Sequence, residues 1–173
     1  YEQAKDTKSA IDGVLNKLVA DFNMYSSTPG FRIVEGIDGV AELYEDILNE
    51  QQPIKLIRSP EDKNNAKLNK MVLNQIEEQR KLGIFIEKTI QQTIAYDKER
   101  LVERHTVPLE KLNIPAQIVI YANKVAFTAY KETIITTIIE NKAVNQTFEI
   151  IFELLWGLTS KEHQDLLASE KSH

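Results

Sequence analysis

The spacing of apolar residues changes several times along this chain, and each change marks the boundary of a predicted element. Between residues 30 and 88, short apolar runs alternate with longer stretches whose apolar residues recur every three or four positions. Short runs predict strands and the longer spacing predicts helices. We expect strands at 31–35, 54–58 and 84–88, with helices at 37–49 and from 59 to about 82. This order favours an α/β domain with a mainly parallel sheet.

The second predicted helix carries start and stop signals at its two ends. Ser59, Pro60, Glu61 and Asp62 offer a capping hydroxyl, a first-turn proline and two acids at the positive end of the helix dipole. Gly83 follows the last helical position, where a left-handed residue commonly ends a helix.

The second half of the chain returns to apolar strands after an irregular stretch. Residues 89–115 lack a clear period and are interpreted as a partly helical excursion. Strands follow at 116–121, 125–130 and 133–140, the first two joined by a turn. Asn141 then caps a helix that brings Trp156 into the core on the stripe Val144, Phe148, Ile151, Phe152 and Leu155. From residue 160 the chain is polar, so a frayed or exposed tail is expected.

The N-terminal segment predicts one more helix. Its apolar residues step alternately by four and three, as in a heptad seam: Ile11, Leu15, Leu18, Phe22 and Tyr25. The seam covers only about two heptads. Two interpretations stay open: a helix packed on its own domain, or a dimerisation helix over residues 1–26.

Composition excludes several classes of site. The 173 residues carry a formal net charge of −5 and contain no cysteine, which excludes disulfides, thiolate nucleophiles and cysteine-based metal sites. Acids are interspersed with the Lys and Arg residues, which argues against this chain alone gripping a nucleic acid. No apolar run is long enough to span a bilayer, and the first residues do not resemble a signal peptide, so a cytoplasmic location is expected.

The sequence contains few residues or motifs that indicate catalysis or ligand binding. Only three histidines are present, and neither a metal-binding nor a phosphate-binding motif is found. Ligands of parallel α/β sheets bind beyond the carboxyl ends of the strands. Those ends carry Glu35, Arg58, Ser59, Lys88, Thr89, Glu140 and Asn141. Five of them form the candidate ligand pocket: Glu35, Arg58, Ser59, Glu140 and Asn141. The alternative is that Ser59 and Asn141 are helix caps and the other residues are solvated edges.

Three blocks of the chain resemble a known family. Residues 29–48, 114–127 and 138–156 resemble the first strand and helix, the hairpin, and the closing strand and helix of the effector domain in TrmB-type transcriptional regulators. The first block includes the Tyr-Glu-Asp core at Tyr44, Glu45 and Asp46.

The resemblance implies an α/β, phospholipase D-like mixed sheet flanked by helices, used for sensing a ligand. In such regulators a dimerising helix joins this domain to an N-terminal winged-helix domain, and residues 1–26 fall where that linker should be. The implied organisation is a linker or dimerisation helix at 1–26, an effector-sensing domain at 29–158 and a polar tail at 159–173. The expected partners are a second copy of the chain and an effector of unknown identity. DNA would be bound only through a winged-helix domain that this chain lacks.

Enzymatic relatives of that fold use a His-x-Lys motif followed by an aspartate. The matching positions here hold Ala116 and Ile118, with Asn123 near the aspartate position. The resemblance therefore implies a non-enzymatic domain without a cofactor. The alternatives are a phosphodiesterase of the phospholipase D-like class and a protein-interaction module that binds no small ligand.

Overall fold

The computed structural model describes residues 13–14, 30–61, 65–84, 86–91, 103–108 and 113–170. Gly13 and Val14 are helical, and Val14 is 60% exposed. The five residues of the predicted seam lie outside the described ranges: Ile11, Leu15, Leu18, Phe22 and Tyr25. The dimerisation helix therefore stays a prediction.

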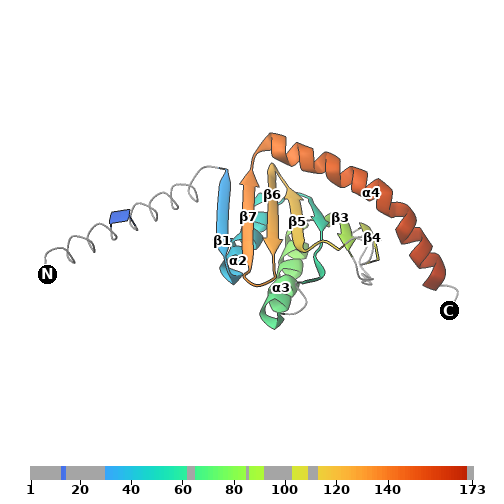
Figure 1. Ribbon diagram of the computed structural model, residues 1–173, viewed down its shortest axis with the longest axis horizontal. Coiled ribbons are helices and arrows are strands. Elements are labelled where there is room, and N and C mark those ends of the chain that lie inside the picture. Colours follow the sequence, from blue (N-terminus) through green and yellow to red (C-terminus); the bar gives the residue numbers. More distant parts are fainter. Residues whose placement is uncertain are drawn as a thin grey trace.

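One seven-stranded sheet forms the centre of the molecule (Figure 1), in the order β1-β7-β6-β5-β2-β3-β4. The strands are β1 (Phe31–Glu35), β2 (Ile54–Ile57), β3 (Ile86–Gln91), β4 (Glu103–Thr106), β5 (Ala116–Tyr121), β6 (Lys124–Ala129) and β7 (Ile135–Glu140). The predicted α/β class and mixed sheet are confirmed.

The expectation of a mainly parallel sheet is wrong. Only β2 with β3 and β3 with β4 pair in parallel, and the other neighbouring strands are antiparallel. The cause is the hairpin of β5 and β6, which together with β7 separates β1 from β2. As a result β1, β6, β2, β3 and β4 run in one direction, while β7 and β5 run in the other.

Helices cover both faces of the sheet (Figure 1). Helices α2 (Ile37–Glu50) and α3 (Ala66–Leu82) lie on one face, and α4 (Lys142–Glu170) crosses the other. Helix α3 starts later than expected, because Asn65 accepts hydrogen bonds from the backbone N–H groups of Lys67 and Leu68 and so provides the N-cap. Gly83 ends α3 in the left-handed conformation (φ 68°), as predicted.

Two segments differ from the sequence-based expectation. Within the irregular stretch 89–115, β3 continues to Gln91 and residues 103–106 form the edge strand β4, where part of a helical excursion was expected. The remainder of that predicted excursion, at 92–102 and 109–112, lies outside the described residues. The short polar strand Glu103–Thr106 gave no apolar signal that would mark it.

Of the two forms expected for the tail, frayed or exposed, the frayed form is not found up to residue 170, since α4 continues without a break to Glu170, whereas residues 161, 164, 165, 168 and 169 are exposed. Thr159 is buried, and the Nδ1 atom of His163 accepts a hydrogen bond of 3.1 Å from the backbone N–H of Thr106 in β4. These polar contacts hold the second half of α4 against the sheet, and apolar periodicity cannot reveal them.

The two layers bury separate apolar cores. The core between α2 and the sheet includes Leu43, Ile47, Ile54, Ile84, Val119, Tyr121, Ala126 and Ile138. The core under α4 includes Ile57, Ile90, Val107, Ile120, Val125 and Phe152, and Trp156 packs against it. Trp156 is thus a packing residue, as expected. Ile151, expected on the same inner stripe, is instead 42% exposed.

Candidate ligand pocket

The structure does not bring the five sequence-predicted pocket residues together. Glu35 ends β1, whereas Arg58 follows β2, four steps further across the sheet. At about 4.8 Å per step, this separates them by roughly 19 Å. Glu35 is exposed at its edge of the sheet.

Glu140 and Asn141 lie at the opposite end of the strands from Glu35. Strand β7 is antiparallel to β1, and the backbone N–H of Glu140 donates to the carbonyl of Gly30, just before β1 begins. The Asn141 side chain accepts a hydrogen bond from the backbone N–H of Val144 at 3.1 Å. Asn141 therefore caps α4, as the structural alternative predicted.

Ser59 is fully buried and its hydroxyl has two backbone partners. It donates to the carbonyl of Pro115 and accepts from the backbone N–H of Glu61, both at 3.3 Å. These bonds join the end of β2 to the start of β5 and shape the turn at residues 60–61. Ser59 is a structural residue in this arrangement.

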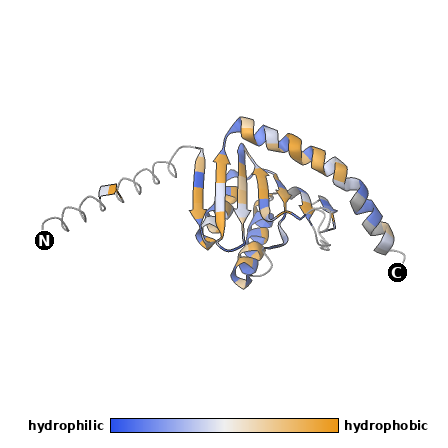
Figure 2. Cartoon of the chain, viewed as in Figure 1, coloured by the Kyte–Doolittle hydropathy of each residue, from blue (hydrophilic) through white to orange (hydrophobic). Residues whose placement is uncertain are grey.

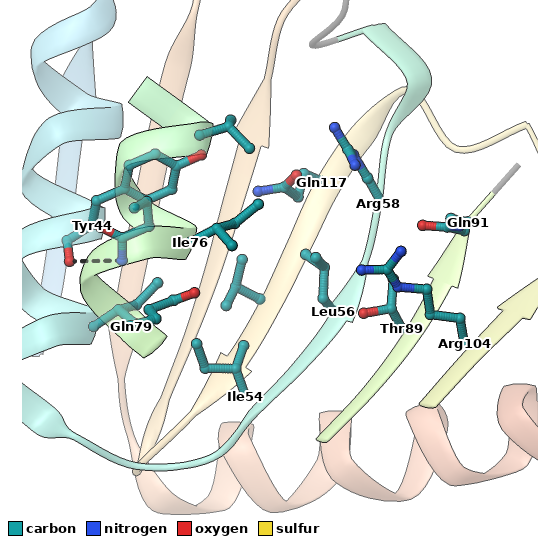
Figure 3. Close-up of a pocket in the computed structure, with 14 residues that line it drawn as sticks. Tyr44, Ile54, Leu56, Arg58, Ile76, Gln79, Thr89, Gln91, Arg104 and Gln117 are labelled. Atoms are coloured by element: carbon teal, nitrogen blue, oxygen red, sulfur yellow. Dashed lines mark hydrogen bonds between the residues drawn. The ribbon is translucent and has the colours of Figure 1, made fainter. Parts of the chain in front are cut away.

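Of these five residues, Arg58 lines the pocket found between the sheet and helices α2 and α3 (Figure 3). The pocket has an empty volume of about 650 Å³, including the solvent at its mouth. Its lining residues are Tyr44, Ile47, Ile54, Leu56, Arg58, Val72, Gln75, Ile76, Gln79, Thr89, Gln91, Arg104, Gln117 and Val119. A recess between two layers that is lined by both apolar and polar side chains has the composition of many small-molecule sites.

The floor of the pocket is built by strand pairing. Thr89 pairs with Leu56 on one side and with Arg104 on the other, so these three residues form a row across β2, β3 and β4. Arg58 and Gln91 each lie two positions further along their strands and therefore point to the same face. Figure 3 shows both arginines and Thr89 beside the same part of the recess.

The helical wall of the pocket combines apolar side chains and amides. Val72 and Ile76 of α3 line the recess, one turn apart. Gln75 is buried and its Nε2 donates to the carbonyl of Tyr44 at 3.2 Å, which fastens α3 to α2 (Figure 3). Gln79 is also buried and lines the recess one turn further on.

The charged residues among the described lining residues are two arginines, and both also interact with other parts of the chain. These are Arg58 and Arg104, and none of the described residues that line the pocket is acidic. Gln117, two residues before Val119 on β5, also lines the recess and is only 6% exposed. Its amide can both donate and accept hydrogen bonds, so it adds polar capacity to this part of the recess.

A second polar cluster lies on the same face and is internally satisfied. The Nζ atom of Lys124 lies 3.0 Å from both carboxylate oxygens of Asp46 and 2.6 Å from Glu50 Oε1. The Tyr121 hydroxyl donates to Asp46 Oδ2 at 2.6 Å, and Arg32 Nη2 lies 3.3 Å from Asp46 Oδ1. Every charge here has an opposite partner, so this cluster joins α2 to the sheet and is not a ligand site.

Burial and hydrogen bonding act in opposite directions on the pKa of Asp46. Burial alone would raise its pKa, but hydrogen bonds from Tyr121 and Lys124 outweigh it, so the pKa is lowered. Burial lowers the pKa of Lys124, and hydrogen bonds to Glu50 and Asp46 reverse the sign and raise it. Both groups are therefore charged at neutral pH. Burial, followed by the hydrogen bond to Asp46, raises the pKa of Tyr121 and keeps it neutral.

The opposite face of the sheet contacts α4 through aromatic and ionic pairs. His105 of β4 stacks on Trp156 with ring centroids 3.4 Å apart, and its Nδ1 lies 3.0 Å from Thr159 Oγ1. Lys88 of β3 lies 2.9 Å from Glu153 Oε2 and 5.4 Å above the Trp156 ring. These contacts dock α4.

The positions that match the His-x-Lys motif of the enzymatic relatives lie on this α4-facing side of the sheet. Ala116 and Ile118 are two residues apart on β5, and Ile118 packs against the core under α4. Neither side chain has a nucleophilic or proton-transferring group. Gln117, between them, faces the pocket on the other side of the sheet.

Two features are absent from the described residues. Among them, no group of three or more His, Cys, Asp or Glu side chains is arranged to hold a metal ion. No helix in the described ranges is both long and apolar enough to cross a membrane.

Neither a protein-family model nor a curated protein sequence matches this chain. Several solved structures do match this chain. TrmBL2, an archaeal chromatin protein with a novel mode of DNA binding, has a TM-score of 0.52 and 16% identity, covering 90% of this chain and 63% of TrmBL2. This chain thus spans less than two thirds of the TrmBL2 chain.

Two phospholipase D-like structures match with similar scores. Nuc from Salmonella typhimurium, a phospholipase D family member, gives a TM-score of 0.51 at 12% identity over 75% of this chain and 95% of Nuc. NucT from Helicobacter pylori gives 0.52 at 9% identity over 73% of this chain and 96% of NucT. The chain therefore has a phospholipase D-like α/β fold. Within that fold class, the expected resemblance to TrmB-type regulators is confirmed at the level of structure by TrmBL2.

Sequence reasoning found Arg58 but missed most of the pocket. Gln75 and Gln79 lie on a helix otherwise interpreted by its apolar stripe, and Arg104 lies in the strand that gave no signal. Gln117 interrupts an apolar strand run, and such an interruption is the one local sign of a polar site that the sequence offered.

Proposed function

We propose that this chain is the non-enzymatic effector-binding domain of a cytoplasmic, prokaryotic transcriptional regulator. It forms a homodimer partly through its N-terminal helix. Binding of a small effector shifts the relative placement of DNA-binding domains that are not part of this chain. Such coupling requires the effector to bind the two arrangements with different affinity.

One observation carries the effector site: the recess between α3 and the sheet, with two arginines and buried amides on its walls. It replaces the five-residue pocket expected from the sequence, of which it keeps Arg58. The similarity of the fold to TrmBL2 supports a role linked to DNA, since that protein is a DNA-binding chromatin protein. Alanine and isoleucine at positions 116 and 118 support the absence of phosphodiesterase chemistry.

Thermal-shift screening tests the sensor role, because a ligand that binds only the folded state raises the melting temperature. Sugars, nucleotides and amino acids form the first panel, with small organic acids added. Ile76→Trp fills the recess and should abolish the shift given by any hit. Leu73→Trp places the same side chain on the exposed side of α3, where Leu73 is 67% exposed, and should retain the shift. A hit equally strong in both variants binds elsewhere and contradicts the assignment of the pocket.

The fold shared with phospholipase D family members favours a phosphodiesterase as the second candidate function. Hydrolysis of a chromogenic phosphodiester by the purified chain measures this directly. We expect no turnover above the buffer rate. Robust turnover that His105→Ala abolishes would overturn the non-enzymatic proposal, provided that circular dichroism shows the variant to be folded.

Sedimentation tests the proposed dimer. Leu15→Asp with Leu18→Asp introduces charges into the predicted seam and should convert the dimer to a monomer. Leu154→Asp with Leu158→Asp is the matched control, because these α4 leucines are 65% and 74% exposed. If only the α4 variant becomes monomeric, the subunits meet through α4 and the seam proposal is wrong.

A further inference from the structure

We infer that the helix predicted at residues 1–26 packs on the sheet of a second copy of this chain, over an apolar patch on β1 and β7. This outer patch consists of Phe31, Ile33, Ile135, Thr137 and Ile139. The inference names the surface that the helix contacts in the proposed homodimer, and so it rests on the proposed function. It is carried by exposed apolar residues both in the patch and in the described part of the helix.

The outer patch lies on the face of the sheet opposite α2. The Cβ atoms of Val34 and Thr136 both lie 3.1 Å from the position that a Cβ would take at Gly39 of α2, so these two residues face that helix. Side chains alternate along a strand, so Ile33 and Ile135 point to the other side of the sheet. This is the side that α4 crosses.

Helix α4 leaves the outer patch partly uncovered. It contacts β4, β5, β6 and β7, and Figure 1 shows it running from the end of β7 towards β4, away from β1. Ile33 is 40% exposed and Ile135 is 41% exposed. A single exposed isoleucine is ordinary, but these two lie on adjacent strands, and Ile33 pairs with Thr137, two residues after Ile135. Contiguous apolar surface of this kind marks an interaction site.

The sequences of β1 and β7 are those of strands covered on both faces. A strand with one solvated face alternates apolar and polar residues, whereas a strand buried on both faces is apolar throughout. Ile33 is followed by Val34 in β1, and Ile138 by Ile139 in β7, so each strand has apolar side chains on both faces. Figure 2 shows both strands as predominantly hydrophobic. Within the described part of the chain, α2 covers one of these faces and the other lacks an equal cover.

The dimensions of the outer patch fit one helix. The five residues of β1 extend about 13 Å, and a helix about 10 Å wide covers two strand spacings of about 4.8 Å each. The predicted seam from Ile11 to Phe22 is about 16 Å long at 1.5 Å per residue. Only residues 26–29 separate Tyr25 from Gly30, just before β1, so the seam ends close to the strand that it would cover in a dimer.

The described part of the N-terminal helix favours a second copy of the chain as the partner. Val14, next to the seam residue Leu15, is 60% exposed, and a Cβ added at Gly13 would meet nothing within 4 Å. These two residues therefore do not pack on their own domain. One chain thus exposes apolar surface on this helix and on its sheet. Two copies that exchange their helices cover both surfaces symmetrically, as in domain-swapped dimers.

Cysteine cross-linking tests this arrangement, because the chain contains no cysteine of its own. Leu18→Cys and Ile33→Cys chains with different tags are co-expressed and treated with a short bis-maleimide. A covalent heterodimer should appear on a denaturing gel. Leu18→Cys with Leu73→Cys is the control, since Leu73 is 67% exposed on α3, and should give none. A heterodimer yield that is no greater with Ile33→Cys than with Leu73→Cys overturns the inference.

Sedimentation equilibrium provides a second measurement. Ile33→Asp with Ile135→Asp places charges under the docked helix and should raise the dissociation constant of the dimer at least tenfold. Leu73→Asp with Leu82→Asp is the matched control, because these α3 leucines are 67% and 46% exposed, and should leave the constant unchanged. Circular dichroism checks that each variant is folded, and the cross-linking result decides if the patch variant is not. An unchanged dissociation constant in a folded patch variant contradicts the inference.

Failure of this inference and failure of the proposed homodimer give different results. If Leu18→Cys chains cross-link only with one another, the two helices pair along their own seams, so the inference is wrong and the homodimer stands. If a chain with both Leu18→Cys and Ile33→Cys cross-links internally and the wild type sediments as a monomer, both are wrong.

Discussion

At the residue scale, Asp46 has the most concentrated set of interactions on the α2 face. It accepts hydrogen bonds from Tyr121 and Lys124 and forms an ion pair with Arg32, so one carboxylate connects α2 to β5, β6 and β1. Asp46 belongs to the Tyr-Glu-Asp block that marks the resemblance to TrmB-type regulators. Its physical role is to neutralise a lysine that is only 6% exposed.

Asp46→Ala should lower the free energy of unfolding by about 2 to 4 kcal/mol, because it leaves the buried Lys124 ammonium without its bidentate partner. Urea denaturation measures this change. Glu45→Ala, at the exposed neighbouring position, should change stability by less than about 0.5 kcal/mol. Equal effects of the two substitutions would show that the cluster contributes no special stabilisation.

The lowered pKa of Asp46 also predicts an acid-dependent loss of stability. A carboxyl whose pKa is lower in the folded than in the unfolded chain stabilises the fold above the unfolded value, which is about 3.8. That contribution disappears as the pH falls through the folded pKa. Denaturation between pH 7 and pH 3 should therefore show a decline in the wild type that is shallower in Asp46→Asn. The raised pKa of Lys124 adds nothing in this range, since its stabilisation is lost only at alkaline pH.

At the element scale, α2 approaches the sheet at Gly39 more closely than a side chain would permit. A Cβ atom at this position would lie 2.6 Å from the carbonyl oxygen of Val34 and 3.1 Å from the Cβ of Thr136. Both obstacles belong to the sheet, β1 and β7, and backbone cannot move aside cheaply. The close packing of α2 on the sheet therefore requires a residue without a side chain at Gly39.

Gly39→Ala should destabilise the domain by about 2 kcal/mol or more, although alanine favours helices by about 1 kcal/mol over glycine. Gly157→Ala is the matched control in α4, because nothing lies within 4 Å of its added Cβ. This control should raise the melting temperature slightly. Stabilisation by both substitutions would contradict the close packing of α2 on β1 and β7.

The sequence predicted most elements because their apolar periods survive in the structure. The strands at 31–35 and 116–121 and the helix from 37 match closely. It failed where polar contacts determine the structure. Strand β4 consists of Glu, Arg, His and Thr and is held by β3 and α4, and the second half of α4 is held by Thr159 and His163. Pairing between distant strands, which sets the sheet order and hence the pocket, has no local signal.

At the scale of the whole molecule, the far end of α4 and the edge strand β4 depend on each other. Thr159 contacts His105, and His163 contacts the backbone of Thr106. A chain ending at Leu158 should therefore lose protection from hydrogen exchange in β4, while β5 and β6 keep theirs. A chain ending at Glu170 is the control and should match the wild type. Unchanged protection of β4 in the shorter chain would contradict this dependence and support the predicted domain boundary at residue 158.

The position of β1 has a consequence for how the chain is made. Among the described strands, β1 pairs only with β7, whose residues follow roughly 100 positions later in the sequence. During synthesis from the N-terminus, β1 and α2 leave the ribosome long before β7 is made. Strand β1 can therefore join the sheet only after β7 has been synthesised. Contacts this distant in sequence slow folding. Nascent chains should consequently expose the apolar residues of β1 and α2 for most of the elongation time, which makes this first strand-helix unit the natural target of a chaperone.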